Sequence, residues 1–131
     1  MWISQLFPRF VEEEDNRMLM EEVLEEELKE VLRSFQKEKS PGPDGLSIEF
    51  FLDLFDLLGL DLLKVVEDTK VSGKIPASFN STFIALIPKV DNPKALNDFW
   101  PISLSNCIYK VVSKVISRRL KVILSVNISD E

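Results

Sequence analysis

Lys39-Ser40-Pro41-Gly42-Pro43-Asp44-Gly45 is the stretch of this sequence that decides how the rest of the chain folds. It holds two of the seven prolines and two of the four glycines. Each proline fixes its own φ and moves the residue before it out of the α region, and each glycine permits turns that a side chain forbids. The stretch therefore predicts a rigid structural loop that joins two helices, in which Asp44 bonds the amides of its own turn.

Amphipathic helices are predicted on both sides of this loop. From Leu19 to Lys37, apolar residues recur at helical spacing, and a run of glutamates fills the other faces. After the loop, Ser47 is the predicted N-cap of a second helix. Gly59 permits a break before a third helix from Leu60 to Val71, and Gly73 suits its end. The acidic run is interpreted as a solvated helix face, with an acidic docking surface for a protein partner as the alternative.

The pattern changes to short extended segments in the second half of the chain. Ser81 to Ile87 is apolar and β-branched between two prolines, which predicts a strand. Asp98 to Leu104 is a second extended segment, and the two are expected to pair as an antiparallel hairpin. Ser105 is the predicted cap of a long helix that runs to about Val126. The fold class expected is α+β: helix-rich, with one small antiparallel β-hairpin and a long C-terminal helix.

The predicted last helix carries an apolar stripe and a basic stripe. The apolar stripe, which is expected to be buried, comprises Cys107, Ile108, Val111, Val112, Val115, Ile116, Leu120 and Ile123. The basic stripe comprises Lys110, Lys114, Arg118 and Lys121. Their spacing places the four cations along one helix face. Such a face is a candidate for contact with a nucleic-acid backbone, and an ordinary solvated face is the alternative.

The net charge of −6 conceals an uneven distribution. Residues 1–69 contain 7 basic and 18 acidic side chains, a net charge of −11, whereas residues 70–131 contain 9 basic and 4 acidic ones, a net charge of +5. A polyanionic partner is therefore expected to meet the second half of the chain. With 131 residues, 45% of them apolar, the chain is long enough for one core.

Several classes of protein are disfavoured by composition. Cys107 is the one cysteine, which excludes an internal disulfide, and histidine, the commonest metal ligand, is absent. The start MWISQLFPRF contains Pro8 and runs into acidic residues, unlike a signal peptide. Aspartates interrupt the most apolar region, so no segment of membrane length is expected. We expect an intracellular protein of the nucleus or cytoplasm, not secreted and without membrane contact.

Three blocks of sequence stand in a recognisable order: KSPGPDG followed by LSIEFF, then IPASFNSTFIALIPKV, then DFWPISLSNCIYKVVSKVISRRLKVIL. Together they resemble the beginning of the reverse transcriptase domain of non-LTR (LINE-type) retrotransposons, especially those of plants. The resemblance extends from about Leu28 to Ser129. It implies a partial reverse transcriptase domain over residues 19–131, made of the fingers and the start of the palm. Residues 1–18 are expected to be a poorly ordered arm, because the start of the chain shows no clear period.

The resemblance implies a fragment that is itself inactive. The catalytic aspartates of the family lie beyond the position of Glu131, so no catalytic residue and no metal ligand is assigned here. Mg²⁺ is implied for the intact enzyme only, and no cofactor is expected for the fragment. The implied partners are an RNA template, a DNA primer and the remaining palm region of the same polymerase. A nucleic-acid-binding module acting through the basic stripe, and an acidic interaction fragment, are the alternative functions.

Two residues of the expected hairpin bear on nucleotide binding. Lys89 matches the family lysine that is expected to reach the phosphates of the incoming deoxynucleotide. Trp100, in Phe99-Trp100-Pro101-Ile102-Ser103, stands where most relatives have an arginine that clamps the triphosphate. Tryptophan offers one donor and no charge, which puts deoxynucleotide binding in doubt.

Overall fold

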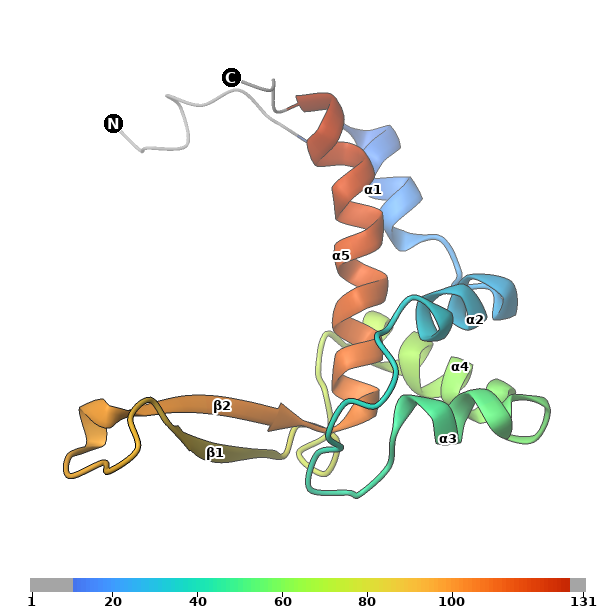
Figure 1. Ribbon diagram of the computed structural model, residues 1–131. Coiled ribbons are helices and arrows are strands. Elements are labelled where there is room, and N and C mark those ends of the chain that lie inside the picture. Colours follow the sequence, from blue (N-terminus) through green and yellow to red (C-terminus); the bar gives the residue numbers. More distant parts are fainter. Residues whose placement is uncertain (1–10, 128–131) are drawn as a thin grey trace, which may run out of the picture.

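A long C-terminal helix, α5 (Cys107–Asn127), is the element against which three of the other helices pack in the computed structural model, which describes residues 11–127. Preceding it along the chain are α1 (Glu13–Met20), α2 (Glu25–Arg33), α3 (Ile48–Asp53), α4 (Phe55–Ser72), β1 (Thr82–Pro88), a 3-10 turn η2 (Leu96–Asp98) and β2 (Phe99–Ser105). Figure 1 shows α1 and α2 beside α5, with α3 and α4 near its start and the β1–β2 hairpin extending away from the helices. The predicted α+β class, with its hairpin and long last helix, is confirmed.

The loop between α2 and α3 forms the turn that its prolines and glycines predict. The Gly45 N–H donates to the Gly42 carbonyl over 3.0 Å, and Gly45 has a φ of +71°, in the left-handed region that glycine tolerates best. The Leu46 N–H donates to Oδ1 of Asp44 over 3.0 Å. The prediction that Asp44 bonds an amide of its own turn is confirmed.

This loop packs directly on the junction between β2 and α5. Gly42 is buried, and a Cβ built on it would lie 2.5 Å from the Asn106 backbone nitrogen and 2.5 Å from the Ser105 carbonyl carbon. The Asp44 N–H donates to Oδ1 of Asn106 over 3.1 Å, and Nδ2 of Asn106 donates to the Ser78 carbonyl over 3.0 Å. The loop therefore joins the helical half of the chain to the start of α5.

The core lies where α2, α3, α4 and α5 meet. Leu28, Val31 and Leu32 of α2 and Val111 of α5 are fully buried. The other buried apolar residues of this cluster are Val23, Phe51, Phe55, Leu62, Val66, Cys107, Val112 and Val115. The helical spacing of the apolar residues thus predicted which faces are buried.

The region expected as one helix from Leu19 to Lys37 contains the end of α1, a break at residues 21–24, and α2. The extended segment at the break is stabilised by distant partners: the Val23 N–H donates to Glu67, and the Glu21 carbonyl accepts from Lys70 and Arg119. Residues 13–18, which were expected to belong to a poorly ordered arm, are helical in α1. Residues 1–10 of the expected arm lie outside the described residues.

The predicted break at Gly59 is wrong. Helix α4 runs through this position, and the break lies instead at Leu54, between α3 and α4. Gly59 is buried against the Phe55 ring, because a Cβ there would lie 3.0 to 3.2 Å from three ring carbons. The glycine therefore permits close packing within a helix. The predicted cap by Ser47 and the predicted helix end at Gly73 are both confirmed, since Ser47 Oγ accepts from the Phe50 N–H and Gly73 adopts a left-handed conformation.

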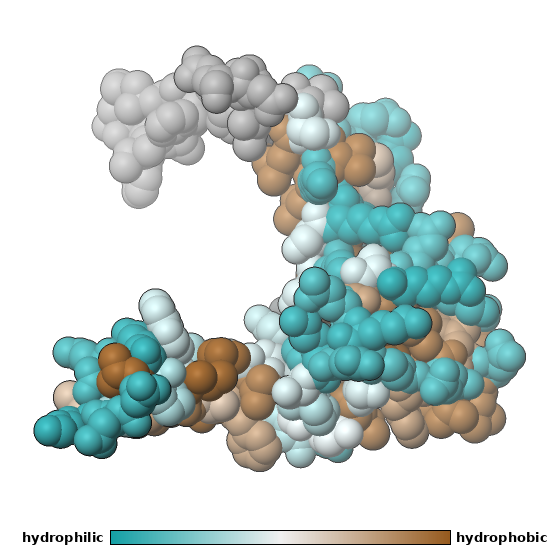
Figure 2. Space-filling model, in the orientation of Figure 1, coloured by the Kyte–Doolittle hydropathy of each residue, from teal (hydrophilic) through white to brown (hydrophobic). Residues whose placement is uncertain are grey.

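The two strands pair as the predicted antiparallel hairpin, with Leu86 opposite Pro101 and Ile87 opposite Trp100. No other described strand joins this sheet. Its apolar side chains are largely exposed, and those with the largest exposure are Phe83, Ile84, Leu86, Ile87, Trp100 and Ile102. Figure 2 shows this arm as a projection that carries both hydrophobic and hydrophilic side chains. The hairpin is thus available for contact with a partner along much of its length.

Helix α5 follows its predicted course with two differences. It begins at Cys107, so Asn106 and not Ser105 precedes it. Ile116 is 48% exposed and Leu120 is half-buried, although both were expected to be buried, because the neighbouring helices cover α5 only in part along its second half. No helix among residues 11–127 has the length and apolar character needed to cross a membrane.

Burial gives Cys107 a pH-dependent effect on stability. Removal from water raises the pKa of its thiol to about 12, and the carboxylate of Asp44 adds to the rise. The folded chain therefore holds this proton more tightly than the unfolded chain, and stability falls as the pH rises above the thiol's ordinary value. We expect Ellman's reagent to react with Cys107 at least about a hundredfold more slowly in native protein at pH 8 than in urea. Equal rates in the two conditions would show that the thiol is accessible.

Candidate nucleic-acid interface

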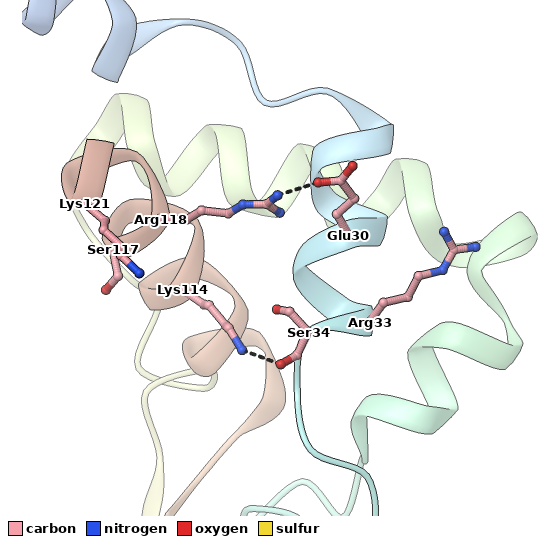
Figure 3. Close-up of a pocket in the computed structure, with 7 residues that line it drawn as sticks. All are labelled: Glu30, Arg33, Ser34, Lys114, Ser117, Arg118 and Lys121. Carbon is pink, nitrogen blue, oxygen red and sulfur yellow. Dashed lines mark hydrogen bonds and ion pairs between the residues drawn. The ribbon is translucent and has the colours of Figure 1, made fainter. Parts of the chain in front are cut away.

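The predicted basic stripe lies along α5 and borders two cavities. Lys114, Arg118 and Lys121 line a groove of about 680 Å³ between α2 and α5, together with Ser117, Glu30, Arg33 and Ser34. Lys110 lines a second cavity, closer to the hairpin. Figure 3 shows Arg118 and Lys114 reaching from α5 toward Glu30 and Ser34, with Ser117 and Lys121 farther from α2. The structure thus brings three of the four predicted cations into one groove and continues the row with the fourth.

Two of these cations are positioned by contacts with α2 and the residues that follow it. Lys114 Nζ donates to the Ser34 carbonyl over 2.8 Å and lies 4.0 Å from the centre of the Phe35 ring. Arg118 forms an ion pair with Glu30 in which the side chains are 48% and 57% exposed. An exposed ion pair is weak, so a phosphate can replace Glu30 at small cost.

Lys121 and Lys110 differ from Lys114 and Arg118 in how their charges are contacted. The ion pairs found among the described residues include neither of these lysines. Lys121 is exposed and Lys110 is half-buried beside the cavity. Their ammonium groups are therefore available to an anion without the loss of an internal carboxylate.

Two arginines were missed by sequence reasoning. Arg33 lines the same groove from α2, and Figure 3 shows that its guanidinium points away from the cations of α5. Arg119 follows Arg118 directly but turns toward the N-terminal helices, where it bonds both carboxylate oxygens of Glu27. Its bond to Glu27 is the largest cause of a raised pKa for Arg119. Spacing alone could not show that Arg119 faces the N-terminal helices while Arg118 faces the groove, because every position of a helix lies on some face.

The acidic run on α2 was interpreted as a solvated helix face, but two of its glutamates also hold α2 against α5. Glu27 and Glu30 bond Arg119 and Arg118 of α5, whereas Glu25 and Glu26 are exposed. The acidic half of the chain thus partly neutralises the basic half across the α2–α5 contact. What remains uncompensated along α5 is Lys110, Lys114 and Lys121.

The second cavity, of about 470 Å³, lies between the hairpin and the loop that organises the fold. Lys39 and Lys110 contribute cations to it and Glu49 contributes one carboxylate. Ile87 and Ile102 of the hairpin contribute apolar surface. This cavity connects the row of cations on α5 with the face of the sheet that carries Trp100, since Trp100 pairs with Ile87.

Lys89 and Trp100 lie together at the outer part of the hairpin. Lys89 Nζ is 4.3 Å from the centre of the Trp100 ring and donates to the Asn97 carbonyl over 2.9 Å. The Lys89 N–H donates to the Asp98 carbonyl over 2.7 Å, which anchors the residue just beyond β1. The Lys89 ammonium thus contacts both an aromatic ring and a backbone carbonyl.

The groups that this surface offers are cations, exposed apolar side chains and an exposed indole ring. Within residues 11–127, no three histidine, cysteine, aspartate or glutamate side chains lie close enough together to hold a metal ion. The residues present therefore do not fit the magnesium site of a polymerase, and no step through a metal is derived. Cations, exposed apolar side chains and one exposed indole suit contact with phosphates and bases.

The comparisons with known proteins point to a mobile element. Over 100 residues the chain is 39% identical to the transposon TX1 uncharacterized 149 kDa protein of Xenopus laevis. The alignment covers 76% of this chain and 8% of that protein, so the chain spans less than a tenth of its relative's length. No protein-family model matches the chain. This similarity is consistent with a retrotransposon-derived fragment.

Proposed function

We propose that this chain is the fingers part of the reverse transcriptase of a LINE-type retrotransposon, and that its own activity is to bind the RNA template and DNA primer. The observation that carries the proposal is the continuous row of cations formed by Lys110, Lys114, Arg118 and Lys121 beside an exposed hairpin. The similarity to a transposon protein and the three sequence blocks support it.

Polymerase activity is not expected of this chain alone. Nucleotidyl transfer uses carboxylates that converge on two metal ions, and the described residues form no such cluster. The purified chain should therefore fail to extend a primer on an RNA template, and extension by it would contradict the proposal.

Charge reversal at two unpaired lysines tests the binding role. We expect Lys110→Glu combined with Lys121→Glu to weaken binding of an RNA–DNA primer–template by roughly tenfold or more at ~0.1 M salt, because two phosphate contacts become repulsive. The double variant should also reduce the slope of log Kd against the logarithm of the salt concentration by about one to two. Fluorescence anisotropy of a labelled primer measures both quantities.

The matched control reverses the charge of two lysines that lie away from the groove. Lys64 lies on α4 and Lys74 follows it, and neither lines the groove between α2 and α5. Lys64→Glu combined with Lys74→Glu alters the net charge equally and should change the affinity by less than about twofold. Equal losses in the two double variants would mean that only the total charge matters, and would contradict an interface on α5.

A further inference from the structure

Trp100 presents an indole ring to solvent from a two-stranded sheet that no other described strand joins. Its exposure is 59%. It lies opposite Ile87, and directly opposed residues of an antiparallel pair point to the same face. The next pair on that face, two residues along, is Ala85 and Ile102. The ring is therefore supported by aliphatic neighbours on a rigid strand rather than carried on a loop.

The cation beside this ring has no anionic partner among residues 11–127. Lys89 contacts the Trp100 ring and the Asn97 carbonyl, and the ion pairs among the described residues do not include it. The nearby carboxylate of Asp98 accepts the backbone N–H groups of Lys94 and Ala95 over 2.9 and 3.0 Å. An ammonium held by a ring and a carbonyl gains charge pairing when a phosphate arrives.

We propose that Trp100 and Lys89 form a stacking site for an unpaired nucleobase of a single-stranded nucleic acid. The base takes the place of the Lys89 ammonium over the indole ring, and this ammonium pairs with the adjoining phosphate. The inference rests on the nucleic-acid role proposed above and names the substrate class of this part of the surface. A π-face accepts any base, so the site discriminates stacked bases from bare phosphate rather than one sequence from another.

The same arrangement disfavours a triphosphate. Recognition of closely spaced phosphate oxygens uses a planar fork of donors, and Trp100 offers one N–H and no charge. A strand leaving the ring toward α5 instead meets Lys39 and Lys110, which line the adjacent cavity with Ile87 and Ile102. These cations extend the site for a nucleic-acid strand of several nucleotides. A single nucleotide would contact only part of this site.

Intrinsic fluorescence of Trp100 tests the stacking directly. The chain contains two tryptophans, so a Trp2→Phe background leaves Trp100 as the only tryptophan. We expect an eight-nucleotide single-stranded RNA to quench this emission saturably. An abasic strand of the same length and charge should quench little and bind at least about fivefold more weakly. A deoxynucleoside triphosphate in excess over the RNA should not reverse the quenching.

Substitutions separate the ring from the charge. By anisotropy, Trp100→Ala should weaken single-strand binding about 5- to 100-fold, and Trp100→Phe should retain most of the affinity. Val71→Ala, at an exposed position on α4 outside the proposed interface, should leave binding unchanged. Because Trp100 is exposed, all three variants are expected to keep the circular dichroism of the parent.

The experiments distinguish failure of the stacking site from failure of the proposed nucleic-acid role. Equal binding of the abasic and base-containing strands, reversal of quenching by the triphosphate, or unaltered binding by Trp100→Ala would refute the stacking site. If Trp100→Ala binds normally while Lys110→Glu with Lys121→Glu still loses affinity, the proposed function stands without it. If neither variant loses affinity, both proposals are wrong.

Discussion

Gly42→Ala should cost about 3 kcal/mol or more of unfolding free energy, a large part of the stability of a domain of this size. The added Cβ would lie 2.5 Å from the Asn106 nitrogen and 2.6 Å from the Ser105 carbonyl oxygen. These are backbone atoms at the junction of β2 and α5, so no flexible side chain can move aside. The loop would have to leave Asn106, and the hydrogen bond from Asp44 to that side chain would be lost. Urea unfolding followed by circular dichroism measures the change.

Gly45→Ala is the matched control, three residues away in the same loop. No atom lies within 4 Å of a Cβ built on Gly45, so only its φ of +71° opposes the substitution. The strain of a left-handed residue costs about 1 kcal/mol. A loss at Gly42 no larger than the loss at Gly45 would mean that the loop does not depend on close contact with the start of α5.

Arg119→Ala should cost about 2 to 4 kcal/mol and release α1 from α5. The side chain is only 12% exposed and bonds both carboxylate oxygens of Glu27, whose side chain is 23% exposed. It also donates to the carbonyls of Leu19, Glu21 and Glu22. Removing it leaves a carboxylate and several carbonyls without their partner. Amide hydrogen exchange should show faster exchange over α1 than in the parent protein.

Arg17→Ala tests whether any arginine near α1 would have the same effect. Arg17 pairs with Glu14, and the two side chains are 72% and 82% exposed, so its loss should cost at most about 0.5 kcal/mol. Arg119→Lys keeps the charge without the planar fork and should fall between the two. Unchanged exchange over α1 in Arg119→Ala would contradict the role given to this side chain.

The elements that short-range patterns specify were predictable from the sequence. Apolar spacing predicted much of the buried faces of α2, α4 and the first half of α5, but Ile116 and Leu120 of the predicted stripe are not buried. Turn chemistry predicted the Asp44 turn, the Ser47 cap and the Gly73 helix end. The hairpin followed from one β-branched segment between prolines and a second extended segment that contains Pro101. Each of these features depends on residues close together in the chain, so its cause is visible in a short window.

The features that were missed depend on distant residues. The break between α1 and α2 is stabilised by Glu67, Lys70 and Arg119, which lie far along the chain from residues 21–24. Gly59 lies in close contact with the Phe55 ring, and the sequence alone does not distinguish such a glycine from one that breaks a helix. In the candidate site, spacing predicted the basic stripe but not the bonds of Lys114 to Ser34 and Arg118 to Glu30, which span 80 and 88 residues.

Photocrosslinking tests the proposed interface most directly. An RNA template carrying 4-thiouridine, annealed to a DNA primer, would be irradiated with the intact chain, and the linked peptides would be identified by mass spectrometry. We expect crosslinks on the hairpin from Thr82 to Ser105 and on α5 between Lys110 and Lys121. Crosslinks concentrated on the acidic helices α1 and α4 would show that nucleic acid does not bind along the basic stripe.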